Sequence, residues 1–143
     1  MTNLSSGLPF GPGWANSPTV PTQAALYDII TSITPNAVVE VTGTTVNLVP
    51  NTVYIMNNAA LITATLPATM SVGSFINIIG KGAGGWRIAQ QANQIIRLGA
   101  TSTTTGTGGS VSSSNRYDST VLRNIVANLE FNATSRNGNL VVV

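Results

Sequence analysis

Several side chains of this sequence are of the kinds that bind sugars. Aromatic rings stack on the apolar faces of sugar rings, while amide, hydroxyl and guanidinium groups hydrogen-bond to their polar edges. Ten residues of these kinds are the candidate contacts with a surface receptor: Trp86, Arg87, Asn93, Thr103, Thr104, Thr105, Ser112, Asn115, Arg116 and Tyr117. For Trp86 the alternative is a place in the apolar core, because it lies on an expected strand.

Catalytic chemistry has few candidate residues. The chain contains no histidine and no cysteine, so the commonest general base and all thiol chemistry are missing. Hydrolysis of a glycan would need a pair of carboxylates, and only Asp118 and Glu130 lie near the receptor candidates in the sequence. No Gly-x-Ser-x-Gly sequence marks a serine nucleophile. The sequence therefore indicates a protein that is not an enzyme and that holds no cofactor and no metal.

The basic residues suggest an acidic partner other than nucleic acid. Lys81 lies between two glycines, but the glycine spacing before it and Gly82 after it do not fit a phosphate-binding loop. All six basic residues lie in residues 81–143, together with two of the four acidic residues. They are scattered singly and form no stripe for nucleic acid. This basic half of the chain could attract an acidic surface polysaccharide.

The composition is poor in charge. Charged residues make up 7% of the chain, whereas Ser, Thr and Asn supply 13, 19 and 15 of its 143 residues. Soluble domains usually contain about 25% charged residues, and a surface with little charge is poorly protected against self-association. We expect much of the surface to be buried in an assembly or carried on a rigid particle. The alternative is a naturally low-charge extracellular domain.

No segment of the sequence is typical of a secreted or membrane protein. The chain does not open with a basic stretch followed by an apolar one, and no apolar run approaches the roughly 20 residues that span a bilayer. We therefore expect a soluble protein without membrane insertion. It would be made in the cytoplasm and reach the outside only by assembly or lysis.

Residues 1–36 are expected to anchor the chain. Residues 1–21 are rich in Pro and Gly, which is typical of an extended arm. Leu8, Phe10 and Trp14 are its candidate contacts with another protein, unless the arm packs on its own domain. Apolar residues at spacings of three and four predict a short helix over residues 22–33. So short a helix needs a partner, either the β-domain or copies of itself around a threefold axis.

Residues 37–143 are expected to form a β-domain. Short runs of β-type residues alternate with turn signals, of which Asn137-Gly138 is a strong hairpin signal. The expected strands are residues 38–42, 45–49, 52–56, 61–66, 74–79, 86–89, 95–98, 120–127, 129–135 and 140–143. This spacing predicts an antiparallel β-sandwich or a barrel-like domain.

Two of these strands, residues 74–79 and 120–127, carry apolar side chains on both faces. One face could belong to a subunit interface, or both could be covered within the domain. The run of Ser, Thr and Gly at residues 99–117 cannot order itself, because it has too little apolar surface to bury. It suits either a displayed loop or packing near a trimer axis. Residues 80–98 before it are expected to be framework.

Four stretches of the sequence resemble a known module. They are NTVYIMNNAALITATLPATMSVGSFINI (residues 51–78), GKGAGGWRIAQQANQIIRLG (80–99), TTTGTGGSVSSSNRYDS (103–119) and SRNGNLVVV (135–143). Together they look like a β-rich C-terminal module of bacteriophage tail-fibre and virion-surface proteins. The resemblance covers residues 51–143. It implies a homotrimer on the virion and carries over no catalytic residues.

The sequence and this resemblance together lead us to expect a structural bacteriophage protein. It would be a short trimeric tail-fibre or baseplate-attached protein, with residues 1–36 contacting other tail or baseplate proteins. Residues 37–143 would then present loops to host-surface polysaccharide. Two alternatives remain open: a capsid decoration or collar protein without receptor binding, and a free lectin-like sugar-binding module.

Overall fold

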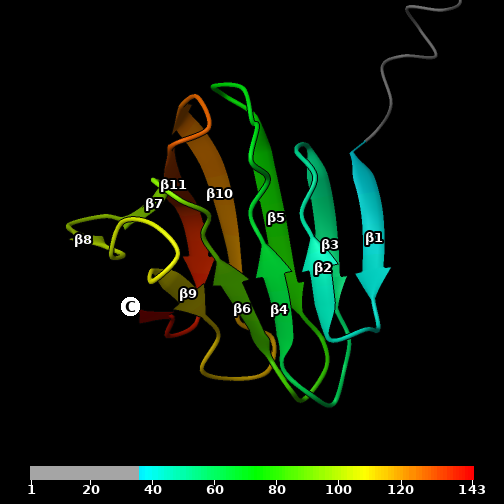
Figure 1. Cartoon of the computed structure of the whole chain (residues 1–143). Coiled ribbons are helices and arrows are strands. Elements are labelled where there is room, and N and C mark those ends of the chain that lie inside the picture. Colours follow the sequence, from blue (N-terminus) through cyan, green and yellow to red (C-terminus); the bar gives the residue numbers. More distant parts are fainter. Residues whose placement is uncertain (1–35) are drawn as a thin grey trace, which may run out of the picture. The chain divides into compact units, whose positions relative to one another are not determined.

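The computed structural model describes residues 36–143, and these residues form β-strands joined by turns and loops (Figure 1). No helix occurs in this range. The candidate anchoring residues Leu8, Phe10 and Trp14 and the helix expected at residues 22–33 lie outside the described residues. The division of the chain at residue 36 therefore stays a prediction.

Twelve strands are present in the described residues. They are β1 (Ala37–Val41), β2 (Thr45–Asn47), β3 (Thr52–Met56), β4 (Ile62–Thr65), β5 (Phe75–Gly80), β6 (Trp86–Ala89), β7 (Ile95–Leu98), β8 (Thr101–Ser102), β9 (Ser110–Ser112), β10 (Ser119–Val126), β11 (Glu130–Asn137) and β12 (Val141–Val142). All ten expected strands are found within a few residues of their expected bounds. The sequence missed β8 and β9, which lie inside the run of Ser, Thr and Gly.

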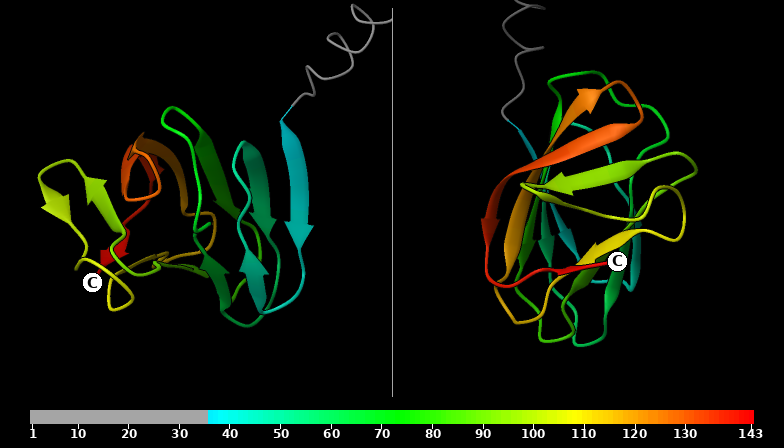
Figure 2. Two further views of the ribbon diagram at one scale, coloured as in Figure 1. Left: turned by 45° about the horizontal axis from the view of Figure 1, so that its top comes forward. Right: turned by 90° about the vertical axis from the view of Figure 1, so that its left-hand side faces the viewer.

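The strands form two sheets that face each other (Figures 1 and 2). Sheet A has the order β1-β3-β5-β10-β11-β7-β8, and sheet B has the order β12-β9-β6-β4-β2. The prediction of a mainly β domain is confirmed, and the two facing sheets agree with a sandwich.

The expectation of an antiparallel domain was wrong for half of the strand pairs. The pairs β1–β3, β3–β5, β2–β4, β4–β6 and β7–β11 are parallel. The first four of these pairs are parallel because the chain crosses to the other sheet after each of its first six strands. A strand that returns to its sheet after one strand in the other sheet runs in the same direction as the previous strand of its own sheet. Turn signals between strands do not reveal such crossings.

The hairpin of β10 and β11 interrupts this pattern. It is inserted in sheet A between β5 and β7, with β10 antiparallel to β5 and β11 parallel to β7. It follows from these pairings that β1, β3, β5, β7 and β11 all run in one direction and that β10 runs in the other. We call the edge of the sandwich where the first group begins the upper edge, because it lies at the top of Figure 1.

Side chains from the inner faces of both sheets make one apolar core. Strands alternate between buried and less buried residues, as in β3 and β4, which is the period of two that one buried sheet face requires. The buried apolar residues are Val41, Leu48, Tyr54, Met56, Ile62, Ala64, Leu66, Met70, Ile76, Ile78, Trp86, Ile88, Ile96, Leu98, Val111, Leu122 and Phe131. Trp86 and Phe131 are the largest of those that are fully buried, and neither is exposed at all.

A repeated turn geometry starts six strands of sheet A. One or two residues before β3, β5, β7, β8, β10 and β11, the backbone has a positive φ, at Asn51, Gly73, Asn93, Gly99, Tyr117 and Asn128 respectively. Asparagine and glycine tolerate this left-handed conformation better than other residues. The high asparagine content is thus in part a requirement of these turns.

The run of Ser, Thr and Gly is ordered by its neighbours. Strand β12 pairs with β9, and the backbone of Val143 exchanges hydrogen bonds with Ser110 and accepts one from Thr104. From the other side, the buried amide of Gln90 donates to the carbonyl groups of Thr104 (3.1 Å) and Gly106 (3.2 Å). The run is therefore part of the fold, although several of its side chains are exposed.

The outer face of sheet A carries apolar side chains. Register and alternation place several on this face, including Val38, Val53, Ile55, Phe75, Ile79, Ile95 and Val121. Val38 is 64% exposed and Ile79 is 36% exposed. Nothing among residues 36–143 covers this face as a second layer would (Figure 2).

Candidate functional site

The structure buries two of the ten candidate receptor contacts. Trp86 is fully buried, and its indole Nε1–H donates to the backbone carbonyl of Asp118 at 2.9 Å. Thr103 is 3% exposed, and its hydroxyl bonds to the backbone of Ile96. Both predictions were wrong as contacts, because each side chain lies on the inner side of its strand or turn. For Trp86 the core alternative is confirmed.

The remaining candidates fall into three separate places. Arg87 and Ser112 are cross-strand neighbours on the outer face of sheet B. Asn93, Thr104 and Thr105 are exposed on the loops that flank β7 and β8. The third group lies together in the loop between β9 and β10: Asn115, Arg116 and Tyr117.

The loop of the third group is shaped by the buried carboxylate of Asp118. Its Oδ2 accepts hydrogen bonds from the backbone N–H groups of Ser114 (2.8 Å) and Asn115 (2.9 Å). The carboxylate thereby folds the loop back on itself, and Tyr117, just before it, takes a φ of 70°. The Tyr117 side chain is left 60% exposed. The Arg116 guanidinium lies over the tyrosine ring, 4.9 Å from its centroid.

A chain of contacts ties this loop to the neighbouring strands. Arg116 Nε donates to the backbone carbonyl of Lys81 at 2.7 Å. Lys81 Nζ in turn lies 2.8 Å from Glu40 Oε1 at the end of β1. We call the group Lys81, Asn115, Arg116 and Tyr117 the Tyr117 edge. It lies opposite the upper edge, because β10 starts beside the end of β5.

The pKa of the Glu40 carboxyl is lowered from its ordinary value of 4.5. The side-chain hydrogen bond from Lys81 is the largest cause, followed by the hydrogen bond from Asn57 and the positive charge of Lys81. Glu40 therefore stays ionised and holds the lysine beside the loop. The sequence around Lys81 was compared only with a phosphate-binding loop, which it does not fit. The ion pair was not predicted, because Glu40 lies 41 residues earlier in the chain.

The two acidic residues considered for hydrolysis do not form a pair. Asp118 directly precedes the first residue of β10, whereas Glu130 pairs with Val126 at the far end of that strand. Eight residues of strand separate the two by about 25 Å, well beyond the roughly 5–10 Å of glycosidase pairs. Glu130 is instead paired with Arg97. Among residues 36–143 no cluster of three or more His, Cys, Asp or Glu could hold a metal ion.

The described part of the chain contains no helix long and apolar enough to cross a membrane. Comparison with known proteins adds no assignment: no family model matches the sequence, and no curated protein is significantly similar to it.

Proposed function

We propose that this chain is a structural protein of a bacteriophage particle that binds host-surface polysaccharide without catalysis. It would be a short trimeric tail-fibre or baseplate-attached protein, as its resemblance to such proteins implies. The observation that carries the binding part is Tyr117, whose large, mostly exposed ring sits on a backbone with a φ of 70°. Bulky residues rarely adopt this conformation, and such costs are concentrated at functional sites.

The Tyr117 edge has the chemistry of a polysaccharide contact. The tyrosine supplies a flat apolar surface, and the Asn115 side chain supplies amide donors and an acceptor. Arg116 is held by the bond from its Nε to the backbone of Lys81. A fixed guanidinium favours uronic acid or phosphate groups of an acidic polysaccharide over a neutral one.

Binding of the full-length protein to purified host polysaccharide tests this proposal. Tyr117→Asn should raise the Kd about tenfold or more, which corresponds to a loss of about 1.4 kcal/mol. The variant should stay folded, because asparagine accepts a positive φ more readily than tyrosine. Arg116→Gln should also weaken binding. Arg87→Gln is the matched control: it removes the same charge from the outer face of sheet B and should leave the Kd unchanged.

Other outcomes would reject the proposal in distinct ways. Equal Kd values for the Tyr117→Asn variant and the original protein would show that the Tyr117 edge is not the polysaccharide-binding site. No binding to any host polysaccharide would favour a capsid decoration or collar protein. Binding by a protein that is absent from purified particles would favour a free lectin. Immunogold labelling of intact particles decides whether the chain is a virion component and where it sits.

The homotrimer part of the proposal is supported by the outer face of sheet A. An apolar sheet face is a usual site of subunit contact, and the low charge of the chain opposes association only weakly. Val38→Lys and Ile79→Lys together should reduce the mass measured by light scattering to that of a monomer. Because both side chains are exposed, the fold should tolerate these changes. Val141→Lys, at 51% exposure on β12, should leave the mass unchanged. A monomer for the unmodified protein at micromolar concentration would refute the trimer.

A further inference from the structure

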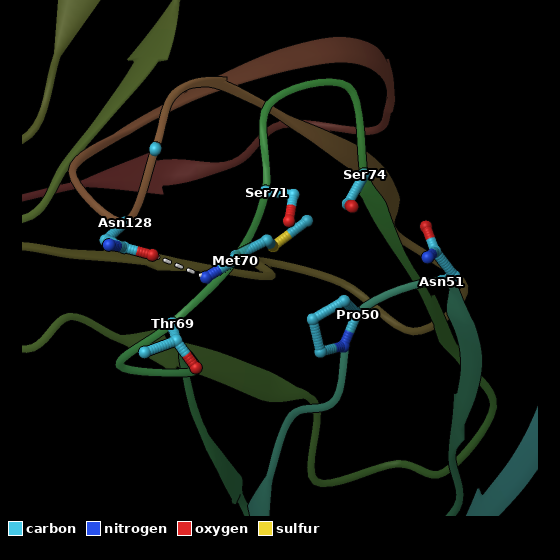
Figure 3. Close-up of a pocket in the computed structure, with 8 residues that line it drawn as sticks. Pro50, Asn51, Thr69, Met70, Ser71, Ser74 and Asn128 are labelled. Atoms are coloured by element: carbon cyan, nitrogen blue, oxygen red, sulfur yellow. Dashed lines mark hydrogen bonds between the residues drawn. The ribbon is translucent and has the colours of Figure 1, made fainter.

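A hollow of about 460 Å³ lies at the upper edge of the sandwich, opposite the Tyr117 edge (Figure 3). It is formed where the β2–β3 loop, the β4–β5 loop and the β10–β11 turn meet. We call it the upper pocket. Its lining residues are Pro50, Asn51, Thr69, Met70, Ser71, Ser74, Ala127 and Asn128. Pockets for small ligands usually measure about 300–1,000 Å³, so its size suits one or two sugar rings.

The lining of the upper pocket is polar but uncharged. Three hydroxyl groups and two amides face the hollow, and no Lys, Arg, Asp or Glu lines it. Pro50 adds an apolar surface, whereas Met70, which also lines the hollow, is only 3% exposed (Figure 3). An anionic ligand would lack a cation to pair with, and a metal ion would lack carboxylates. A neutral sugar fits, since it has an apolar face and a ring of hydroxyl groups that both donate and accept.

The two asparagines of the pocket are held in place. Asn128 Oδ1 accepts from the N–H of Met70 at 2.7 Å, and the Asn128 N–H donates to the Met70 carbonyl at 3.0 Å. Asn51 Oδ1 accepts from the N–H of Phe75 at 3.3 Å. These bonds use the oxygen of each side chain and leave its NH₂ group available for a ligand. Because both side chains are already held, they lose little conformational entropy when a ligand binds.

A buried asparagine whose backbone bonds to the pocket residue Ser74 has no partner for its side chain. Asn124 is 1% exposed, and within the described residues neither its Nδ2 nor its Oδ1 makes a hydrogen bond. Its backbone N–H donates to the Ser74 carbonyl, and its own carbonyl accepts from Gly73. A buried amide left in this state costs about 1–3 kcal/mol. Asn124 does not line the hollow, so this cost bears on the stability of this edge of the fold and not on contact with a ligand.

From these observations we infer that the upper pocket is a binding site for a neutral monosaccharide unit. Pro50 contacts the apolar face of the ring. The NH₂ groups of Asn51 and Asn128 donate to its hydroxyl groups, which in turn bond to the serine hydroxyls. This site is separate from the Tyr117 edge and does not depend on it.

Titration of the ¹⁵N-labelled full-length protein with single neutral sugars tests the inference. Glucose, galactose, mannose and N-acetylglucosamine are added one at a time, with sodium sulfate as an anionic control. At least one sugar should shift the side-chain NH₂ signals of Asn51 and Asn128 with a Kd in the millimolar range, and sulfate should not. Ser71→Phe should fill the hollow and raise the Kd about tenfold or more. The exposed Ser71 side chain makes no hydrogen bond within residues 36–143, so the variant should fold.

The readout separates this inference from the function proposed above. Shifts of the Asn51 and Asn128 signals that persist in the Tyr117→Asn variant support the upper pocket, whether or not the Tyr117 edge binds a ligand. Shifts confined to Asn115, Arg116 and Tyr117 would overturn the pocket and leave the proposed function standing. The absence of any shift at Asn51 and Asn128 with all four sugars would also overturn it, as would unchanged binding by Ser71→Phe.

Discussion

The loop between β5 and β6 should be disrupted by a single methyl group. A Cβ atom placed on Gly84 would lie 2.1 Å from the carbonyl carbon and oxygen of Ala60, and one on Gly82 would lie 2.2 Å from the carbonyl oxygen of Asn58. The atoms in the way belong to the backbone of the β3–β4 loop and cannot turn aside like a side chain. The two loops are also joined by the hydrogen bond from the Gly84 N–H to Asn58 at 3.0 Å.

The cost of Gly84→Ala can be worked out from this geometry. An ordinary Cβ contact is at least 3.4 Å, so the loops must separate by about 1.3 Å, which breaks their hydrogen bond. Loss of the bond costs about 1 kcal/mol, and the forced backbone shift costs about 1–3 kcal/mol. We therefore expect the free energy of unfolding to fall by about 2–4 kcal/mol, out of the roughly 5–15 kcal/mol typical of a domain. For a domain of this size the melting temperature should drop by about 10–25 °C.

Urea unfolding of the full-length protein, followed by tryptophan fluorescence and circular dichroism, measures this change. Gly108→Ala is the matched control, because its Cβ meets no atom within 4 Å and its φ is outside the left-handed region. That control should be neutral or stabilise the protein by less than about 1 kcal/mol. All proteins are compared at one concentration, since assembly would shift the midpoint. Equal unfolding midpoints for Gly84→Ala and Gly108→Ala would refute the close-contact argument.

Three further predictions concern residues that the fold places in its interior or across strands. Trp86→Phe should lower the free energy of unfolding by about 2 kcal/mol in the urea assay, because it loses buried volume and the indole hydrogen bond. Gln90→Leu should lower it by about 1–3 kcal/mol and speed amide hydrogen exchange in residues 101–110, which its amide holds; unchanged exchange there would contradict this role. Lys81→Met should raise the pKa of Glu40 toward 4.5, as followed by carboxyl NMR. Because that pKa is lowered in the folded protein, the ion pair contributes stability above about pH 4.5 that is lost as the pH falls through the folded pKa, and the variant should lack this component.

Local signals in the sequence predicted where strands lie but not how they pair. Each expected strand is a run of β-type residues between turn residues, and such runs depend on neighbours in sequence. Strand direction depends instead on whether the chain crosses to the other sheet, as it does between β3 and β4 and between β5 and β6. No local residue pattern reports that crossing.

The two missed strands show a related limit. Residues 101–102 and 110–112 are Ser, Thr and Val with glycine around them, and they have almost no apolar surface of their own. Strand β8 pairs with β7, and β9 pairs with β6 and with the C-terminal strand β12. Gln90 holds the loop between β8 and β9, so the order of both strands comes from residues outside the run. Thr103 was mistaken for a surface residue for this reason.

The candidate site was predictable to the extent that it is local in sequence. Asn115, Arg116 and Tyr117 are consecutive, so their types alone marked them. Arg116 contacts Lys81, which follows β5, and Lys81 contacts Glu40 on β1. These contacts join residues that are far apart in the sequence, so no local pattern predicts them. The upper pocket combines three loops, and the residues that line it are ordinary turn residues when taken singly.

Strand direction explains why the two proposed sites lie at opposite edges. In sheet A, β3, β5, β7 and β11 run in one direction and begin at the upper edge, so their left-handed turn residues gather there. Two of those residues, Asn51 and Asn128, line the upper pocket. Strand β10 runs the other way, and the left-handed residue before it is Tyr117, the only aromatic one of the six. A fully antiparallel sheet would have distributed these turns between both edges. The parallel pairs that the sequence did not reveal are therefore what bring the pocket together.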